Sequence, residues 1–151
     1  MKEVCNLKSD HVEAIEKYLR KIDYIVRKNG RMILNDYNLT APQFTALQIL
    51  INSGGMTISE LSQKMDLACS TITDLIDRME KSELVKRTRD EKDKRVVRVT
   101  TLEKGNEVLN KVMERRVQFL DNKLEDLSIE EKENLMNALE KLYKSMSEEL
   151  N

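Results

Sequence analysis

Apolar residues recur at the spacing of an α-helix along most of this chain, and the spacing changes clearly only once, between residues 84 and 100. Only four glycines and one proline occur among the 151 residues, so few positions can interrupt a helix. The first long stretch predicts a helix over residues 9–36, because its apolar positions alternate in steps of three and four. These positions are Val12, Ile15, Leu19, Ile22 and Val26. The sequence therefore predicts a mostly helical protein.

Two capping boxes mark the starts of the next two helices. In LTAPQF, Thr40 is placed to accept a bond from the backbone of Gln43, whose side chain returns it, and this predicts a helix over residues 41–52. The same arrangement of Thr57 and Glu60 in MTISEL predicts a helix over residues 58–65. A Ser-Gly-Gly sequence separates the two helices.

A third short helix follows after a link of only four residues. Its stripe of Ile72, Leu75, Ile76 and Met79 predicts a helix over residues 70–81. The apolar period then changes to two in residues 95–100, and residues 84–88 form a second strand-like run. The polar loop between these runs, residues 89–94, predicts a β-hairpin. Two short helices with a tight link, followed directly by a hairpin, form a helix-turn-helix (58–81) with a wing (84–100).

Two further helices are predicted over residues 101–125 and 128–150, each opened by a candidate capping box. The box partners are Thr100 with Glu103 and Ser128 with Glu131. The predicted fold class is mainly α with a small β-hairpin wing (α+β), in one domain over residues 1–151 with a core over 9–147. The long helices over 9–36, 101–125 and 128–150 flank a winged module too small to cover all their apolar faces, which favours dimerisation. Packing within one chain would cover part of that area.

The charge of the chain is unevenly distributed. Seven basic and three acidic residues give residues 84–100 a net charge of +4, whereas the whole chain carries −1 and the remainder therefore −5. A basic segment on an acidic body is typical of a phosphate-binding site, and the alternative is a solvated charged loop.

The second helix of a helix-turn-helix lies in the major groove, and basic residues of the wing bind phosphates or the minor groove. The base-contacting candidates are Ser70, Thr71, Thr73 and Arg78, and the phosphate-contacting candidates are Lys86, Arg87, Arg89, Lys92, Lys94 and Arg98. Asp74 and Asp77 cannot donate to bases, and we expect them to pair with Arg78 and Lys81 one turn later. The alternative is that this is an ordinary solvated helix face.

Five motifs in one order carry a family resemblance. They are LTAPQFTALQIL (39–50), ISELSQKMDL (58–67), STITDLIDRMEKSELVKR (70–87), DEKDKRVVRVT (90–100) and EKG (103–105). Together they resemble the MarR (multiple antibiotic resistance regulator) family of winged helix-turn-helix transcription factors over nearly the whole chain.

The resemblance implies a homodimer in which the first and last helices of both chains interlock and two winged modules bind a pseudo-palindromic operator in double-stranded DNA. Two-fold symmetry then requires half-sites about 10 base pairs apart. Asp93-Lys94-Arg95 resembles the family's wing-tip Asp-x-Arg element, so Arg95 is implied to enter the minor groove.

The sequence departs from the family pattern at four places. Ala68 stands where many relatives have a capping Ser or Asp, so capping of the recognition helix would pass to a neighbour such as Asp66 or Ser70. Asp74 replaces a frequent basic residue, and Glu83 replaces a glycine expected in a left-handed turn. Thr101 and Leu102 reverse the usual Leu-Thr order.

The resemblance also implies an effector, since relatives often bind small aromatic acids or lipophiles between the dimerisation helices and the winged module. The candidate pocket residues are Tyr18, Tyr24, Tyr37, Phe44 and Phe119, for which the alternative is an ordinary core role. Other relatives sense oxidants through cysteine. Cys69, at the predicted start of the recognition helix, is the better candidate for a redox role, and Cys5 is the second.

Several function classes find no support. His11 is the only histidine and no Cys/His cluster has ligand spacing, so no metal or cofactor is expected. No glycine-rich phosphate loop or nucleophile motif indicates an enzyme. The longest apolar run is three residues, too short for a membrane span. The absence of a signal-like stretch and the small number of cysteines favour a cytoplasmic protein.

The sequence therefore predicts a homodimeric, sequence-specific DNA-binding transcription regulator, and more specifically a repressor released by a small-molecule ligand. Two alternatives stay open. One is a winged-helix module that binds a protein partner through its acidic surfaces and has weak or no specific DNA binding. The other is a thiol-based redox-sensing regulator.

Overall fold

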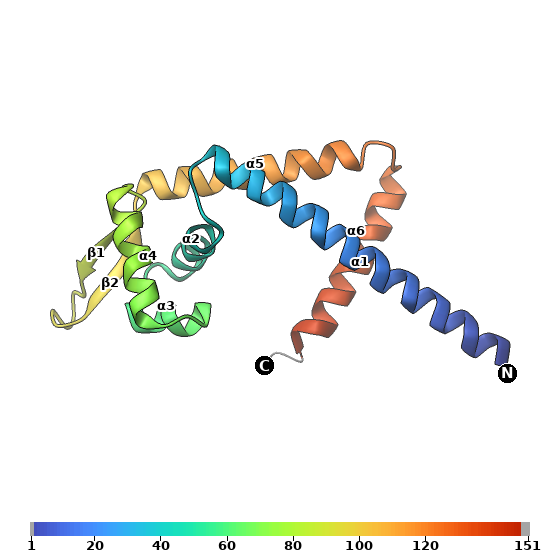
Figure 1. Cartoon of the computed structure of the whole chain (residues 1–151), viewed down its shortest axis with the longest axis horizontal. Helices are drawn as coiled ribbons and strands as arrows, with labels where there is room; N and C mark the ends of the chain where they lie inside the picture. The colour runs from blue at the N-terminus through green and yellow to red at the C-terminus, as the bar shows by residue number, and fades with distance from the viewer. Residues whose placement is uncertain (1, 149–151) are drawn as a thin grey trace. The chain divides into compact units, whose positions relative to one another are not determined.

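The computed structural model describes the backbone of residues 2–148 and the side chains of residues 10–147. Its elements, shown in Figure 1, are α1 (Lys2–Asp36), α2 (Ala41–Ser53), α3 (Ile58–Met65), α4 (Cys69–Lys81), β1 (Val85–Arg89), β2 (Val97–Thr101), α5 (Glu103–Lys123) and α6 (Ile129–Glu148). This order confirms the predicted fold class, mainly helical with one β-hairpin. Within residues 2–148, no helix combines the length and the apolar character that crossing a bilayer requires.

The chain forms two compact units, one ending at Met113 and the other beginning at Glu114, within α5. The first unit contains the winged module, in which α2, α3, α4 and the hairpin pack around one core. Its fully buried side chains are Leu47, Leu50, Leu61, Ile72, Ile76, Met79, Val85, Val99 and Val112. The second unit contains the end of α5 and α6.

β2 bonds to a partner on each of its edges. It pairs antiparallel with β1, from Val85 opposite Thr101 to Arg89 opposite Val97. On its other edge, Val99 and Met56 exchange two backbone hydrogen bonds, of 3.1 and 2.7 Å. The segment before α3 therefore extends the sheet, and this fixes the wing to the helix-turn-helix through the backbone.

Three of the four predicted capping boxes form, with partners Thr40 and Gln43, Thr57 and Glu60, and Ser128 and Glu131. The box of Thr100 with Glu103 is wrong. Thr100 lies in β2, and its buried hydroxyl has no hydrogen-bond partner in the described structure. The strand extends one residue further than predicted, which takes Thr100 out of the cap position.

The start of α4 has no side-chain cap. The N-cap residue is Ala68, and neither Asp66 nor Ser70 replaces the missing cap. Asp66 instead ends α3 in the left-handed conformation, at φ 52°. The link between α3 and α4 is held by Ser62, whose hydroxyl donates to the carbonyl of Leu67.

Glu83 adopts the left-handed conformation expected for a glycine at this position, at φ 60°. The backbone N–H of Leu84 donates to the carbonyl of Met79, which closes the end of α4 with a Schellman bond. Because a side chain is strained at positive φ, Glu83→Gly is expected to raise the free energy of unfolding by about 1 kcal/mol. The substitution also removes the ion pair of Glu83 with Lys104, at 3.6 Å, but this pair is exposed and its loss should cost little stability.

Urea unfolding would measure this difference, and Glu107→Gly is the matched control. Glu107 is exposed inside α5, so this change should lower stability by about 1 kcal/mol. If Glu83→Gly also lowered stability, the left-handed turn would not be a strained one.

Candidate nucleic-acid interface

α4 divides into a buried and an exposed face. Ile72, Ile76 and Met79 have no exposed surface and fix the helix on the core. The opposite face is exposed and consists of Ser70, Thr71, Thr73, Asp74, Asp77 and Arg78. The predicted base-contacting residues thus lie together on one surface. The hydroxyl of Thr73 is already committed as a donor, since it bonds to the carbonyl of Cys69 at 2.8 Å.

Two carboxylates of α4 bind Arg87 of β1. One guanidinium nitrogen donates to Asp77 at 2.7 Å, the other to Glu80, and the backbone N–H of Arg87 donates to Glu80 at 2.8 Å. Burial opposes the charged form of Arg87, but the bonds to Asp77 and Glu80 outweigh it and raise the pKa of the guanidinium. The expected pair of Asp77 with Lys81 is therefore wrong, and Arg87 is held by two carboxylates of its own chain.

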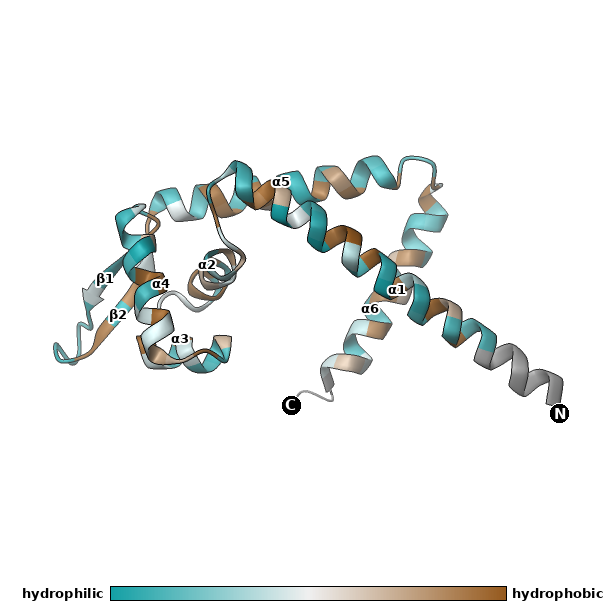
Figure 2. Ribbon diagram, viewed as in Figure 1, coloured by the Kyte–Doolittle hydropathy of each residue, from teal (hydrophilic) through white to brown (hydrophobic). Residues whose placement is uncertain are grey.

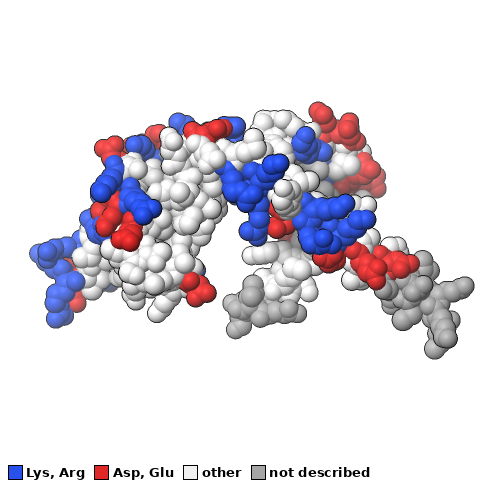
Figure 3. Space-filling model, in the orientation of Figure 1, with Lys and Arg blue, Asp and Glu red and all other residues white. Residues whose placement is uncertain are grey.

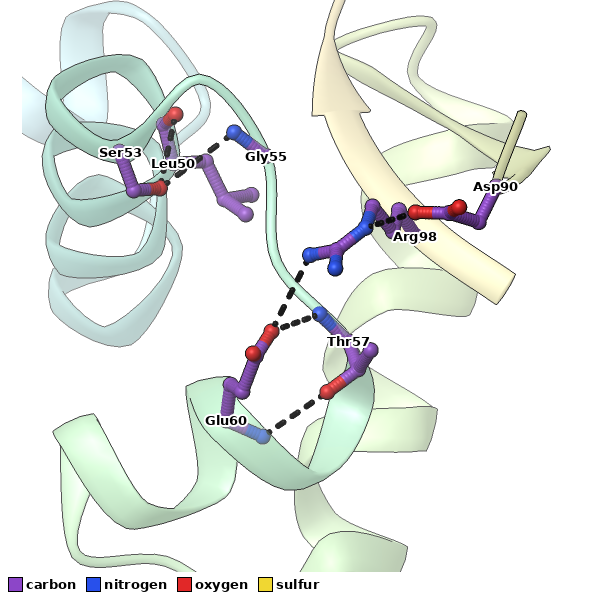
Figure 4. A network of polar contacts seen from close by, with 7 residues as sticks. All are labelled: Leu50, Ser53, Gly55, Thr57, Glu60, Asp90 and Arg98. Atoms are coloured by element: carbon purple, nitrogen blue, oxygen red, sulfur yellow. Dashed lines mark hydrogen bonds and ion pairs between the residues drawn. The ribbon is translucent and has the colours of Figure 1, made fainter. Parts of the chain in front are cut away.

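Arg98 of β2 links the wing to α3, as Figure 4 shows. Its guanidinium donates to Asp90 at 2.6 Å and to Glu60 at 3.4 Å. Glu60 also accepts from the backbone N–H of Thr57 at 2.8 Å, and this bond is the largest cause of its lowered pKa. Arg98, expected as a phosphate contact, therefore has two carboxylate partners within the chain.

Asp90 organises the turn at the end of the hairpin. Its carboxylate accepts from Arg98 and from the backbone N–H groups of Lys92, at 2.8 Å, and Asp93, at 3.1 Å. These bonds, that of Arg98 first, lower the pKa of Asp90 from 3.8 to about 2. One carboxylate thus closes the loop and anchors β2.

The wing tip presents Arg95 to solvent. Its side chain is 92% exposed, and its guanidinium donates to both carboxylate oxygens of Asp93, at 3.1 and 3.2 Å. This pairing is the largest cause of the lowered pKa of Asp93. Lys86, Lys92 and Lys94 are exposed, and Arg89 donates to the carbonyl of Lys94 at 3.4 Å. Figure 3 shows cations gathered at this end of the hairpin.

Comparison with known proteins shows which family this winged module resembles. The MarR family model matches residues 39–97. The uncharacterized HTH-type transcriptional regulator YsmB of Bacillus subtilis is 48% identical over 137 residues, which cover 91% of this chain and 94% of the relative. The chain belongs to the MarR family. A MarR family protein from Bacillus stearothermophilus has a solved structure with TM-score 0.83 and 47% identity, covering 92% and 97% of the two chains.

A more distantly similar chain was solved on DNA. The structure is of an S. aureus MepR mutant bound to an oligodeoxyribonucleotide, with 20% identity and TM-score 0.70, covering 87% of this chain and 96% of that one. At this identity the likeness concerns the fold alone. The two more similar proteins are named as a transcription regulator and a MarR family protein, not as enzymes.

The aromatic pocket candidates of this MarR family protein are in different environments. Phe44 is buried in the core of the first unit and Tyr37 packs against it. Tyr18 and Tyr24 are exposed on α1. Phe119 belongs to the second unit, where the ammonium of Lys123 lies 5.9 Å from its ring centre.

Of the redox candidates, Cys69 is free, exposed and the first residue of α4. The side chain of Cys5 lies outside the described residues. Among the residues that the structure describes, no three His, Cys, Asp or Glu side chains gather to hold a metal ion.

Sequence reasoning missed Glu60, Glu80 and Asp90 as partners of arginines from other segments, and it paired Asp77 with the wrong cation. Asp90 had a local signal, because an aspartate in a turn commonly accepts hydrogen bonds from the backbone N–H groups two and three residues later. Glu60 and Glu80 had none, since their arginine partners come from strands 38 and 7 residues away.

The exposed Lys92 gives a prediction for this MarR family wing. If its ammonium neutralises a phosphate, Lys92→Ala should weaken binding to all sequences similarly and reduce the slope of log affinity against log salt by about one per wing.

Arg95→Ala should instead cost more affinity on A/T-rich than on G/C-rich flanks, because a narrow minor groove concentrates negative potential. Fluorescence anisotropy titrations at several salt concentrations would measure both. An unchanged slope for Lys92→Ala would show that this side chain faces solvent.

Proposed function

We propose that this chain is a homodimeric repressor that binds a pseudo-palindromic operator and is released from it by a small-molecule ligand. The observation that supports it best is that the exposed face of α4 and the exposed cations of the wing belong to one braced module. Arg87 ties β1 to α4, and Arg98 ties β2 to α3. A rigid module of this kind keeps a groove-reading helix and a wing in fixed register.

In this proposal α4 lies in the major groove, where Ser70, Thr71 and Arg78 reach base edges. Arg95 enters the minor groove, and Lys86, Arg89, Lys92 and Lys94 bind phosphates. Arg87 and Arg98 contribute through the position of the wing and not through phosphate. The MepR mutant shows that a chain with this fold can be held on DNA.

The homodimer is supported by apolar side chains that each helix leaves exposed. On α1, Val12, Ile15, Ile22 and Ile25 are more than half exposed. On α6, the same holds for Met136, Tyr143 and Met146, and Figure 2 shows hydrophobic positions recurring along α1, α5 and α6. Soluble monomers rarely leave such surface uncovered, and a second copy with the same helices would cover it. The two compact units would then act together as one MarR-type domain.

Sedimentation equilibrium tests the dimer directly. The expected mass is twice the 17.6 kDa of one chain. A monomer at micromolar concentration would contradict this part of the proposal.

The effector would be a small aromatic or lipophilic molecule. It lowers operator affinity only by the difference between its affinities for the two arrangements of the dimer. We place this regulator in the cytoplasm because it must reach its DNA.

The test of the whole proposal is selection of bound sequences from a random DNA pool by the purified chain. At about 150 mM salt, non-specific phosphate binding is weak enough for a specific motif to emerge. The expected result is a palindromic motif with half-sites about 10 base pairs apart. Binding that enriches no motif would contradict specific operator recognition and favour a protein partner.

A further inference from the structure

The acidic residues of α4 are in two different situations. Asp77 and Glu80 both bind Arg87, so each of these carboxylates has a cationic partner within the protein. Asp74 has no hydrogen bond or ion pair with any described residue, and the expected bond to Arg78 one turn later is absent. Within the described chain, Asp74 is therefore the carboxylate of α4 that has no partner, and it lies on the exposed face.

Asp74 lies at the middle of that face. It is two residues from both Ile72 and Ile76, whose side chains are fully buried, and two residues correspond to about 200° around a helix. Its side chain therefore points almost directly away from the core. Ser70 lies one turn before it and Arg78 one turn after it, each displaced by about 40° around the helix and to opposite sides.

A carboxylate is best placed over the middle of the major groove. The phosphates of the two strands line the rims of the groove, so the midline is where a negative charge is least repelled. A carboxylate can only accept hydrogen bonds. Guanine offers two acceptors in the major groove and thymine offers an acceptor and a methyl group, whereas cytosine offers its N4 amino donor. Adenine has an N6 amino donor, but its N7 acceptor lies beside this group and repels a carboxylate.

We propose that Asp74 reads a cytosine in each half-site by accepting a hydrogen bond from the N4 amino group. The inference rests on the proposed function, because α4 must lie in the major groove for this contact to form. Part of the selectivity comes from exclusion, since guanine or thymine at this position brings an acceptor against an unpaired carboxylate.

The experiment is the same random-pool selection with four full-length proteins: the wild type, Asp74→Asn, Asp74→Ala and Asp77→Asn. Asp77→Asn is the matched control, because it removes the same charge from the same helix face three residues later, while its amide oxygen can still accept the bond from Arg87, which Glu80 also holds. All three substitutions are at exposed side chains, and the asparagine variants preserve shape. Affinities for operators with each base at the selected position complete the measurement.

The wild type is expected to select C at one symmetric position of each half-site, with about tenfold loss per half-site for thymine there. Asp74→Asn should select adenine, whose N6 and N7 match an amide, and Asp74→Ala should discriminate less than about twofold. Asp77→Asn should keep the cytosine. A palindromic motif that is identical for the wild type and Asp74→Asn would overturn the role of Asp74 and leave the regulator intact. No motif with any protein would overturn the proposed function itself.

Discussion

Asp90→Ala is expected to weaken DNA binding, although it removes a negative charge from the most basic segment of the chain. Its carboxylate holds two backbone N–H groups of the hairpin turn and the guanidinium of Arg98. Without these bonds the turn that carries Lys92 and Arg95 is free to move, and DNA binding must then order it. Hydrogen bonds to an ionised group are stronger than neutral ones, so we expect about tenfold weaker binding per wing and about a hundredfold for a dimer on its operator.

The neighbouring Glu91→Ala is the control that separates charge from structure. Glu91 is exposed and makes no hydrogen bond or ion pair with a described residue. Losing its charge should tighten binding modestly, about twofold, since only long-range repulsion from phosphate is removed. Anisotropy titrations on the selected operator at one salt concentration would compare the two variants. If Asp90→Ala tightened binding as well, the bonds at the wing would have no part in DNA recognition.

The pH dependence of the wing follows from the same carboxylate. The pKa of Asp90 is depressed from 3.8 to about 2, so its contribution to stability is fully present above pH 3.8 and is lost as the pH falls toward 2. The backbone N–H groups of Lys92 and Asp93 should therefore stay protected between pH 8 and pH 5. Amide exchange measured by NMR and corrected for intrinsic rates would reveal any opening within that range, which would contradict a carboxylate held in this way.

The features that were predictable from the sequence are local ones. The capping boxes at Thr40, Thr57 and Ser128 form as expected, because donor and acceptor are three residues apart and need no tertiary partner. The hairpin and the six helices of the described residues were also predicted, since the spacing of apolar residues follows the period of the strand or helix that carries them. Thr100 shows the limit of this reasoning: the sheet held it in the extended conformation although the local pattern favoured a cap.

Pairs between distant elements could not be predicted in this way. Local spacing favoured Lys81 as the partner of Asp77, but the packing of β1 on α4 brings Arg87 within 2.7 Å. The net positive charge of the wing was counted correctly, but it did not show which cations are available to phosphate. Arg87 and Arg98 are paired with carboxylates of their own chain. Which cation faces DNA depends on which acids the fold brings near it.

Gly105→Ala is expected to destabilise the protein, although alanine is the better helix former. Gly105 lies in α5 against the backbone that follows the left-handed turn, and an added Cβ would be 2.3 Å from the carbonyl oxygen of Leu84 and 3.1 Å from a methyl group of Leu47. That carbonyl also accepts from the backbone N–H of Leu102 at 2.9 Å, so it cannot move away freely. We expect a loss of about 3 kcal/mol, the upper range for overpacking, because backbone and not a flexible side chain must shift.

Gly30→Ala makes the same change at a site where the added Cβ meets no neighbouring atom of the described chain. Gly30 lies inside α1 with no atom within 4 Å of the added Cβ, so helix propensity should stabilise this variant by about 1 kcal/mol. Urea midpoints at equal protein concentration would compare the two, since dimer formation makes stability depend on concentration. Opposite signs would show that the contact of α5 with Leu84, at the base of the wing, requires a glycine. A gain in stability for Gly105→Ala would mean that α5 is not seated this closely on the wing.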